Sequence, residues 1–232
     1  MESILSLRHV QKKYQQNEVL KDISFDILPG QIVGLMGPNG SGKTTLIKII
    51  NTLITDYSGE VLVCGSLPGI ESKKIISYLP DKSNLIEGIK THKLVNIYDD
   101  FFENFDRAKA FDMLKTIGID KNVFVRTLSK GMREKLILVL TMSKKAKLYI
   151  FDEPIAGVDP AAREFILSTI IKNYSENSAI LFSTHLISDA EQILSRVLFL
   201  RDGVITLDMD TDELREKRQL SVDQIFREEF RC

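Results

Sequence analysis

Gly37-Pro38-Asn39-Gly40-Ser41-Gly42-Lys43-Thr44 is the stretch that decides the fold of this chain. An apolar run at residues 32–36 precedes it and a second run at residues 46–50 follows it, so the local order is strand, glycine-rich loop and helix. The spacing fits G-x-x-x-x-G-K-[ST], in which the glycines let backbone N–H groups point at a phosphate. The stretch therefore predicts a phosphate-binding P-loop in an α/β protein.

Two side chains of this loop have expected roles. We expect Lys43 to reach the β- and γ-phosphates of a nucleotide and Thr44 to offer its hydroxyl to Mg²⁺. The helix that follows adds free N–H groups and the positive end of its dipole, which favour an anion. An ordinary glycine turn beside a lysine is the alternative, but every fixed position of the motif is present between a strand and a helix.

The composition bounds the class of protein. The 232 residues are 44% hydrophobic and 27% charged, and a formal net charge of -1 gives no global basic field for nucleic acid. Cys64 and Cys232 form no C-x-x-C pair, so we expect neither a disulfide framework nor a zinc site, and we expect Cys64 in the core. No apolar run approaches the length of a membrane span, and the first residues lack the pattern of a signal peptide.

The spacing of apolar residues organises the rest of the chain. Strand-like runs before the P-loop predict an N-terminal antiparallel β subdomain. From about residue 89 to 145 the period changes to 3.6, which predicts an α-helical lobe inserted between two strands of the main sheet, with Ser129 as a helix N-cap. Buried runs at residues 148–151 and 179–183 and a hairpin at Asp202-Gly203 then complete a mixed or parallel sheet with flanking helices.

Charged residues follow two of the buried strands. Asp152 and Glu153 end one strand and His185 follows another, so all three are expected at the sheet edge that carries the P-loop. There Asp152 would help to hold Mg²⁺ through its water shell, and Glu153 would orient or deprotonate a water for attack on the γ-phosphate. His185 would contact the γ-phosphate and that water. A solvated strand end and a structural histidine are the alternatives, which the P-loop context disfavours.

The order of five motifs resembles the ATP-binding subunit of ABC transporters over roughly residues 3–207. The motifs are the P-loop, Leu128-Ser129-Lys130-Gly131-Met132, Ile150-Phe151-Asp152-Glu153-Pro154, Gly157-Val158-Asp159 and Ser183-Thr184-His185. The resemblance implies an ATP-binding domain at residues 1–207 and a short charged extension at residues 208–232. Leu220, Ile225 and Phe226 of this extension could dock on the domain or on a partner.

The resemblance also assigns contacts that the residues alone leave open. Tyr14 takes the place of the aromatic residue that stacks on adenine, although a core tyrosine is equally compatible with its position. Ser129 and Gly131, otherwise an ordinary capped helix, resemble the signature loop that binds the ATP of a second subunit, and Asp159 resembles a dimer-contact aspartate. Glu153 resembles the catalytic base and His185 the switch histidine. The other predicted contacts are Gly37, Asn39, Gly40, Ser41, Gly42, Lys43, Thr44 and Thr45 for ATP, and Thr44, Asp81 and Asp152 for Mg²⁺.

Two places depart from the family pattern. Asp81 stands where a glutamine is usual before the lobe, and its shorter, charged side chain can still reach Mg²⁺ or its water. Lys130 and Met132 replace a glycine and a glutamine of the signature loop, while Gly131, which must approach a phosphate, is retained. These variants are similar to bacterial exporter subunits of the bacitracin-resistance and peptide-export type.

The resemblance implies an Mg²⁺-dependent ATPase subunit that pairs head to tail with itself or with a sister ATPase. It would power a transmembrane permease from the cytoplasmic face of the membrane, exporting a peptide, an antibiotic or another amphipathic compound, with no nucleic-acid partner. A non-transport ATPase acting on nucleic acid or ribosomes is the alternative class, which would predict a basic face or two fused cassettes. A regulatory module without turnover is disfavoured by the presence of Glu153 and His185.

Overall fold

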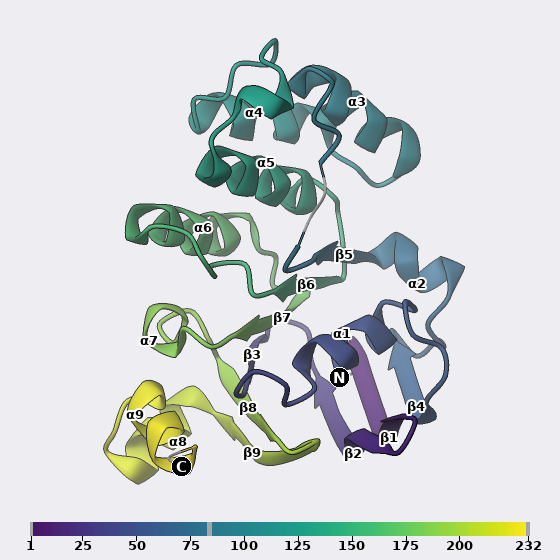
Figure 1. Ribbon diagram of the computed structural model, residues 1–232, viewed down its shortest axis with the longest axis vertical. Coiled ribbons are helices and arrows are strands. Elements are labelled where there is room, and N and C mark those ends of the chain that lie inside the picture. Colours follow the sequence, from purple (N-terminus) through teal and green to yellow (C-terminus); the bar gives the residue numbers. More distant parts are fainter. Residues whose placement is uncertain (1, 83–84, 231–232) are drawn as a thin grey trace.

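Nine strands form one mixed sheet in the computed structural model, which describes residues 2–82 and 85–230 (Figure 1). Their order is β4-β1-β2-β9-β8-β3-β7-β6-β5. The mutually parallel strands are β3 (Ile32–Met36), β5 (Ile76–Leu79), β6 (Leu148–Asp152), β7 (Ala179–Thr184) and β8 (Arg196–Arg201). Antiparallel pairing joins β1 (Leu5–Tyr14), β2 (Asn17–Ile27) and β4 (Ser58–Val63), and it also joins β9 (Val204–Asp210) to β8.

Alternate residues of the parallel strands point into two apolar clusters on opposite faces of the sheet. Leu148 and Ile150 of β6 join the cluster that includes α1 (Lys43–Ile50), whereas Tyr149 and Phe151 join the cluster that includes α6 (Pro160–Asn173). Both faces of these strands are covered, which explains why the strands read as continuous apolar runs. The predicted α/β sheet with flanking helices and an N-terminal antiparallel subdomain is confirmed.

The strand register brings the expected site to one edge. β3 lies between β7 and β8, with Met36 opposite both Thr184 and Phe199. β6 pairs with β7, and Asp152 lies opposite Ser183. Because these strands run parallel, their carboxyl ends meet at the same edge, and the P-loop follows the end of β3 there.

The residues between β5 and β6 build a helical lobe with an apolar cluster of its own. Val95, Leu114 and Leu136 are at most 1% exposed in this cluster. The predicted N-cap Ser129 accepts a hydrogen bond from the Met132 N–H at 3.3 Å. The elements of the lobe are α3 (Thr91–Phe101), α4 (Arg107–Thr116), the 3-10 turn η1 (Val125–Thr127) and α5 (Lys130–Met142).

The last two helices return to the sheet. α8 (Thr211–Arg218) and α9 (Val222–Glu229) follow β9, and Leu214 and Ile225 are 1% exposed in the same cluster as α6. Phe226 meets Phe199 of β8 edge to face, with ring centroids 5.4 Å apart. The C-terminal extension therefore packs on its own domain.

Several local features differ from the expectation. α2 (Ile70–Ile75) occupies a polar segment that has too short an apolar pattern to predict a helix, and α7 (Ile187–Ala190) is only four residues long. The prediction that Cys64 belongs to the core is wrong. β4 ends at Val63, and Cys64 is exposed in the turn that follows, with φ +49°. Cys232 lies outside the described residues.

Lys144 is a buried cation on the segment that leads from the lobe back to β6. It is 7% exposed, and its ammonium group donates hydrogen bonds to the carbonyl oxygens of Lys73 at 2.7 Å and Ile76 at 2.6 Å. The ring of Phe102 lies 4.6 Å from the same nitrogen. Burial lowers the pKa of Lys144 to about 8 from an ordinary value of 10.5, because the charged form is desolvated.

Replacing Lys144 by methionine is expected to remove a pH dependence from the folding stability. Between about pH 8 and 10.5 the unfolded chain keeps the Lys144 proton and the folded chain does not. The free energy of unfolding of the natural protein should therefore rise with pH relative to Lys144→Met, by on the order of 3 kcal/mol across this interval. Urea unfolding at both pH limits measures the difference. The exposed Lys172 of α6 provides the control Lys172→Met, which should keep the natural profile. The same profile in Lys144→Met contradicts the assignment.

Candidate active site

The P-loop links β3 to α1 through backbone that only glycine adopts readily. Gly40 and Gly42 have φ values of +82° and +109°. Gly37 is required for space, since a Cβ there would lie 2.3 Å from the carbonyl oxygen of Leu200 and 2.6 Å from Ser41 Oγ. Asn39 and Gly40 are exposed at the tip of the loop, Ser41 is buried and Thr45 is half-buried. The loop is thus preformed, and its tip is open to a ligand.

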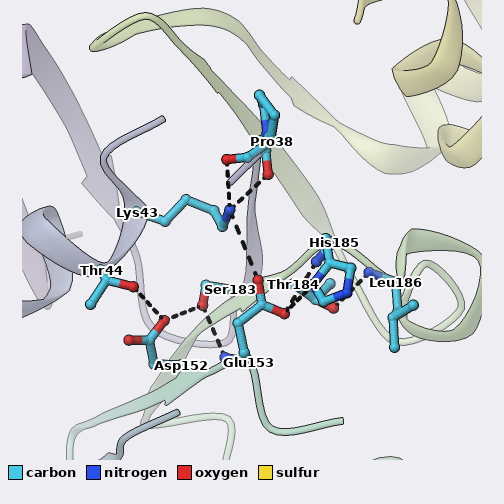
Figure 2. A network of polar contacts seen from close by, with 10 residues as sticks. Pro38, Lys43, Thr44, Asp152, Glu153, Ser183, Thr184, His185 and Leu186 are labelled. Carbon is cyan, nitrogen blue, oxygen red and sulfur yellow. Dashed lines mark hydrogen bonds and ion pairs between the residues drawn. The ribbon is translucent and has the colours of Figure 1, made fainter. Parts of the chain in front are cut away.

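Lys43 points back into the loop that carries it. Its ammonium group donates hydrogen bonds to the carbonyl oxygens of Gly37 at 2.7 Å and Pro38 at 3.2 Å, and it lies 3.9 Å from Glu153 Oε1 (Figure 2). Burial lowers the pKa of Lys43, while the charges of Glu153 and Asp152 oppose that shift. A buried cation held by carbonyl dipoles and a carboxylate is a ready partner for a phosphate.

Two hydroxyl groups converge on Asp152 at the end of β6. Ser183 Oγ donates to Asp152 Oδ1 at 2.7 Å, and Thr44 Oγ1 approaches the same oxygen at 3.5 Å (Figure 2). The other oxygen, Oδ2, is buried without a hydrogen-bond partner in the part of the chain that the structure describes. Burial raises the pKa of Asp152, the two hydroxyl groups lower it, and the nearby carboxylates of Asp81 and Glu153 raise it further.

Glu153 lies between two basic groups. One carboxylate oxygen accepts a hydrogen bond from the His185 N–H at 3.3 Å and lies 2.8 Å from His185 Nδ1, and the other faces Lys43 (Figure 2). Glu153 also has φ +53°, a left-handed conformation that is uncommon for this residue type. The Glu153 N–H donates to the Ser183 carbonyl oxygen at 3.1 Å, which fixes the bend after β6. The structure therefore brings Lys43, Asp152, Glu153 and His185 together, as the sequence predicts.

Tyr14 is the last residue of β1, at the hairpin that leads into β2. Its ring is 45% exposed, and Lys12 Nζ lies 4.8 Å from the ring centroid. Lys12 is itself anchored by Asp56 at 2.9 Å. The strand β2 touches the P-loop, since a Cβ on Gly42 would lie 2.8 Å from Leu20 Cδ2. The exposure of Tyr14 fits a stacking surface better than a core position.

Asp81 follows β5, and its carboxylate lies near enough to Asp152 to raise the pKa of that group. It lines a cavity of about 40 Å³ together with Glu153 and Glu134. Glu134 comes from α5 of the lobe, and burial raises the pKa of its carboxyl group. Glu134 is absent from the predicted site residues, because the solvent-facing side of an amphipathic helix is the ordinary place for a glutamate.

Ser129, Gly131 and Asp159 gather away from the P-loop. A Cβ on Gly131 would lie 3.9 Å from Asp159 Oδ2, and Lys130 Nζ donates to the carbonyl oxygen of Gly157 at 3.1 Å. Within residues 2–82 and 85–230, no hydrogen bond or ion pair joins this group to the P-loop. In Figure 1, the strands β5 and β6 lie between α5 and α1. The structure therefore does not bring these three predicted contacts to the ATP loop of the same chain.

The family model described as ABC transporter matches residues 20–156, which is more than half of the chain. The chain belongs to the ABC transporter family. This ABC protein is an ATP-binding subunit of a transporter, and it is an ATPase, as the sequence predicts. No helix in the described part of the chain combines the length and apolar character needed to cross a bilayer.

Its relatives differ in the direction of transport. The ABC transporter ATP-binding protein YtrB of Bacillus subtilis is 34% identical over 92% of this ABC protein and 74% of YtrB. The SkfA peptide export ATP-binding protein SkfE of B. subtilis is 25% identical and the phosphonates import ATP-binding protein PhnC of Treponema denticola is 29% identical, with at least 92% of both chains covered in each case. A solved ATP-binding subunit of an ABC transporter superposes with a TM-score of 0.87 and 26% identity, covering 97% of this chain and 99% of that one.

Two further side chains of this ABC protein belong with the site although they are absent from the predicted set. Ser183 holds Asp152 through its hydroxyl group, and Lys12 lies against the Tyr14 ring. Ser183 is visible in sequence as the residue before Thr184-His185, and the parallel pairing of β6 with β7 is the signal that would place it beside Asp152. Lys12 precedes Tyr14 by two residues on β1, and a separation of two residues is the signal that would place both side chains on one face of a strand.

Proposed function

We propose that this ABC ATPase powers the export of a peptide, an antibiotic or another amphipathic compound through a transmembrane permease at the cytoplasmic face of a membrane. The convergence of Lys43, Asp152, Glu153 and His185 at one sheet edge supports the ATP-driven part. The similarity to SkfE and the signature-loop variants support export. The similarity to PhnC favours import, and a transport assay in oriented vesicles separates the two directions.

Hydrolysis at this edge is proposed to begin when Lys43 exchanges its contact with Glu153 for a contact with ATP. The γ-phosphate of ATP takes over Lys43, which releases one oxygen of Glu153. Glu153 then accepts a proton from a water molecule whose oxygen bonds to the γ-phosphorus as ADP leaves. His185 holds the other Glu153 oxygen during this step, and Tyr14 stacks on the adenine.

Mg²⁺ fits the donor set at Asp152. Asp152 Oδ2 is a buried carboxylate oxygen without a partner in the described residues, and the hydroxyl group of Thr44 lies beside the same carboxylate. Asp152 and Thr44 would hold the ion, with Asp81 reaching it or its water, and the phosphates would complete its coordination. When bound, Mg²⁺ neutralises phosphate charge that develops during transfer.

Removing the Ser183 hydroxyl group is expected to lower the Mg²⁺ affinity of the ATPase by about 10- to 100-fold, because Asp152 loses the group that orients it. Turnover of Ser183→Ala measured against Mg²⁺ concentration gives this shift. Ser188→Ala, on α7 away from Asp152, is the matched control. A Ser183→Ala variant with the natural Mg²⁺ dependence contradicts the assignment of Asp152.

Two copies are proposed to close head to tail, either as a homodimer or with a sister ATPase. The separation of Ser129, Gly131 and Asp159 from the P-loop of their own chain supports this arrangement, because a second copy can supply them. We assign residues 1–207 to the ATP-binding domain, with the inserted lobe at about 89–145, and residues 208–232 to an extension. The packing of α8 and α9 on the domain supports a stabilising role for that extension.

Affinity purification from gently solubilised membranes of the native host tests the proposal. We expect a polytopic membrane protein to co-purify and to stimulate ATP turnover when both are reconstituted in vesicles. ATP-dependent uptake of an amphipathic peptide into vesicles with the ATPase on the outside supports export. Release of the peptide from vesicles in that orientation supports import. Recovery of the ATPase in a soluble fraction bound to ribosomes or nucleic acid contradicts the proposed role in transport.

A further inference from the structure

A cavity of about 690 Å³ lies at the sheet edge opposite the ATP loop. Ile75, Lys147 and Ser178 line it, and each is the residue immediately before one of the parallel strands β5, β6 and β7. Asp152 and His185 lie at or just beyond the other ends of β6 and β7. The cavity is therefore remote from the nucleotide site.

The wall of this cavity is strongly basic. Five lysines and one glutamate line it, although the whole chain has a formal net charge of -1. Lys74 pairs with Glu71 and Lys145 with Asp106. No ion pair joins the remaining three lysines to a carboxylate in residues 2–82 and 85–230. The remaining three are Lys73, Lys109 and Lys147, and the glutamate is Glu103.

Lys109 shows that the positive charge is incompletely balanced. It is half-buried on α4, and burial lowers its pKa, with a further lowering from the ammonium group of Lys145. The carboxylate of Asp106 acts in the opposite direction but is shared with Lys145. An anion in the cavity would relieve the repulsion between these cations.

The outer rim of the cavity is apolar. Ile70 at the start of α2 is 80% exposed, Phe101 at the end of α3 is 79% exposed, and Phe102 is 37% exposed. Figure 1 shows α2 and the end of α3 on the same side of the molecule. Asn104 fixes the floor, since its Nδ2 donates to the carbonyl oxygens of Lys74 and Lys145 at 2.5 Å each. The two hydrogen bonds of Asn104 thus hold the floor of the cavity together, while the aromatic side chains of the rim stay exposed.

We infer that this cavity binds a small amphipathic organic anion, with a phosphate or carboxylate head on Lys73, Lys109 and Lys147 and an apolar body against Ile70, Phe101 and Phe102. The volume lies in the range of small-molecule sites, about 300–1,000 Å³. Because the lysines line a cavity, the ligand is a single molecule that enters it. Neither the ATP site nor the proposed transport role is needed for this binding.

Calorimetric titration of the full chain without nucleotide tests the inference, with octyl phosphate as the probe. Inorganic phosphate supplies the head alone and octyl glucoside the alkyl body alone. We expect octyl phosphate to bind more tightly than either, by about tenfold or more, because the charged and apolar contacts act together. Equal affinity for octyl phosphate and octyl glucoside, or for octyl phosphate and inorganic phosphate, overturns the inference.

Charge reversal locates the site. The double variant Lys73→Glu/Lys147→Glu should bind octyl phosphate about tenfold or more weakly, since both exposed cations become repulsive. The double variant Lys21→Glu/Lys93→Glu changes the net charge equally at exposed positions outside the cavity and should bind as the natural protein does. Phe101→Ser should lower the affinity for octyl phosphate and leave that for inorganic phosphate unchanged. Equal loss in the two double variants overturns the location, and the thermal unfolding midpoint of each variant verifies that it is folded.

Discussion

Steady-state ATP turnover of the Glu153→Gln variant is expected to fall by about 10²- to 10⁴-fold, while ATP still binds. Glutamine keeps the size of the side chain and its hydrogen-bonding capacity toward His185, so the site geometry should survive. It cannot accept the proton of the attacking water, and it also loses the charge that faces Lys43 at 3.9 Å. The variant should therefore accumulate with bound ATP and, under the proposed dimer arrangement, as a stable dimer.

Phosphate release and size-exclusion chromatography with ATP and Mg²⁺ measure the two effects. Glu164→Gln is a suitable control, because Glu164 is an exposed residue of α6 and the substitution removes the same charge. This control should hydrolyse ATP at the natural rate and elute as the natural protein does. Turnover in Glu153→Gln equal to that of the control would assign the base to another residue.

ATP affinity of the Lys43→Ala variant is expected to fall by about 100-fold or more, since hydrogen bonds to charged groups contribute roughly 1.5–3 kcal/mol each. Lys43 is 6% exposed and is the cation closest to Glu153 in the loop. Its removal leaves the Glu153 carboxylate facing the place where a phosphate must enter. The loss of attraction is thus compounded by repulsion between two anions.

Equilibrium titration with a fluorescent ATP analogue measures this affinity. Lys48→Ala is the matched control, because Lys48 belongs to the same helix α1 but is exposed on its surface. The control should bind the analogue as tightly as the natural protein. Retained affinity in Lys43→Ala would contradict the P-loop assignment, provided that its unfolding midpoint stays close to that of the control.

Features with a local cause were predictable from the sequence. The P-loop has fixed glycine positions because Gly37 has no room for a Cβ and Gly42 has φ +109°. Buried parallel strands read as continuous apolar runs, so Asp152 and His185 could be placed at strand ends before the register was known. The lobe was predictable because its helices bury a stripe against one another, with Val95 and Leu114 in the interior.

Features set by tertiary contacts were not predictable. The position of Lys43 against Glu153 depends on the placement of β3 and β6 on either side of β7. α9 was missed because its apolar side chains are few and interrupted by charges, and Phe226 becomes informative only beside Phe199. The basic cavity brings together the end of α2, the end of α3 and the segment after α5, which are far apart in the sequence.

The position of β3 in the sheet also dictates the order in which the molecule can be assembled. The ladder of β3 is completed only by β7 and β8, which are synthesised long after the P-loop itself. Helices of the lobe have local partners and can form while the ribosome is still translating. A nascent chain that ends before Ala179 consequently carries an intact ATP-loop sequence but lacks both strands that pair with β3. Nucleotide recognition is therefore a late event in biogenesis, and prematurely terminated chains should fail to retain ATP.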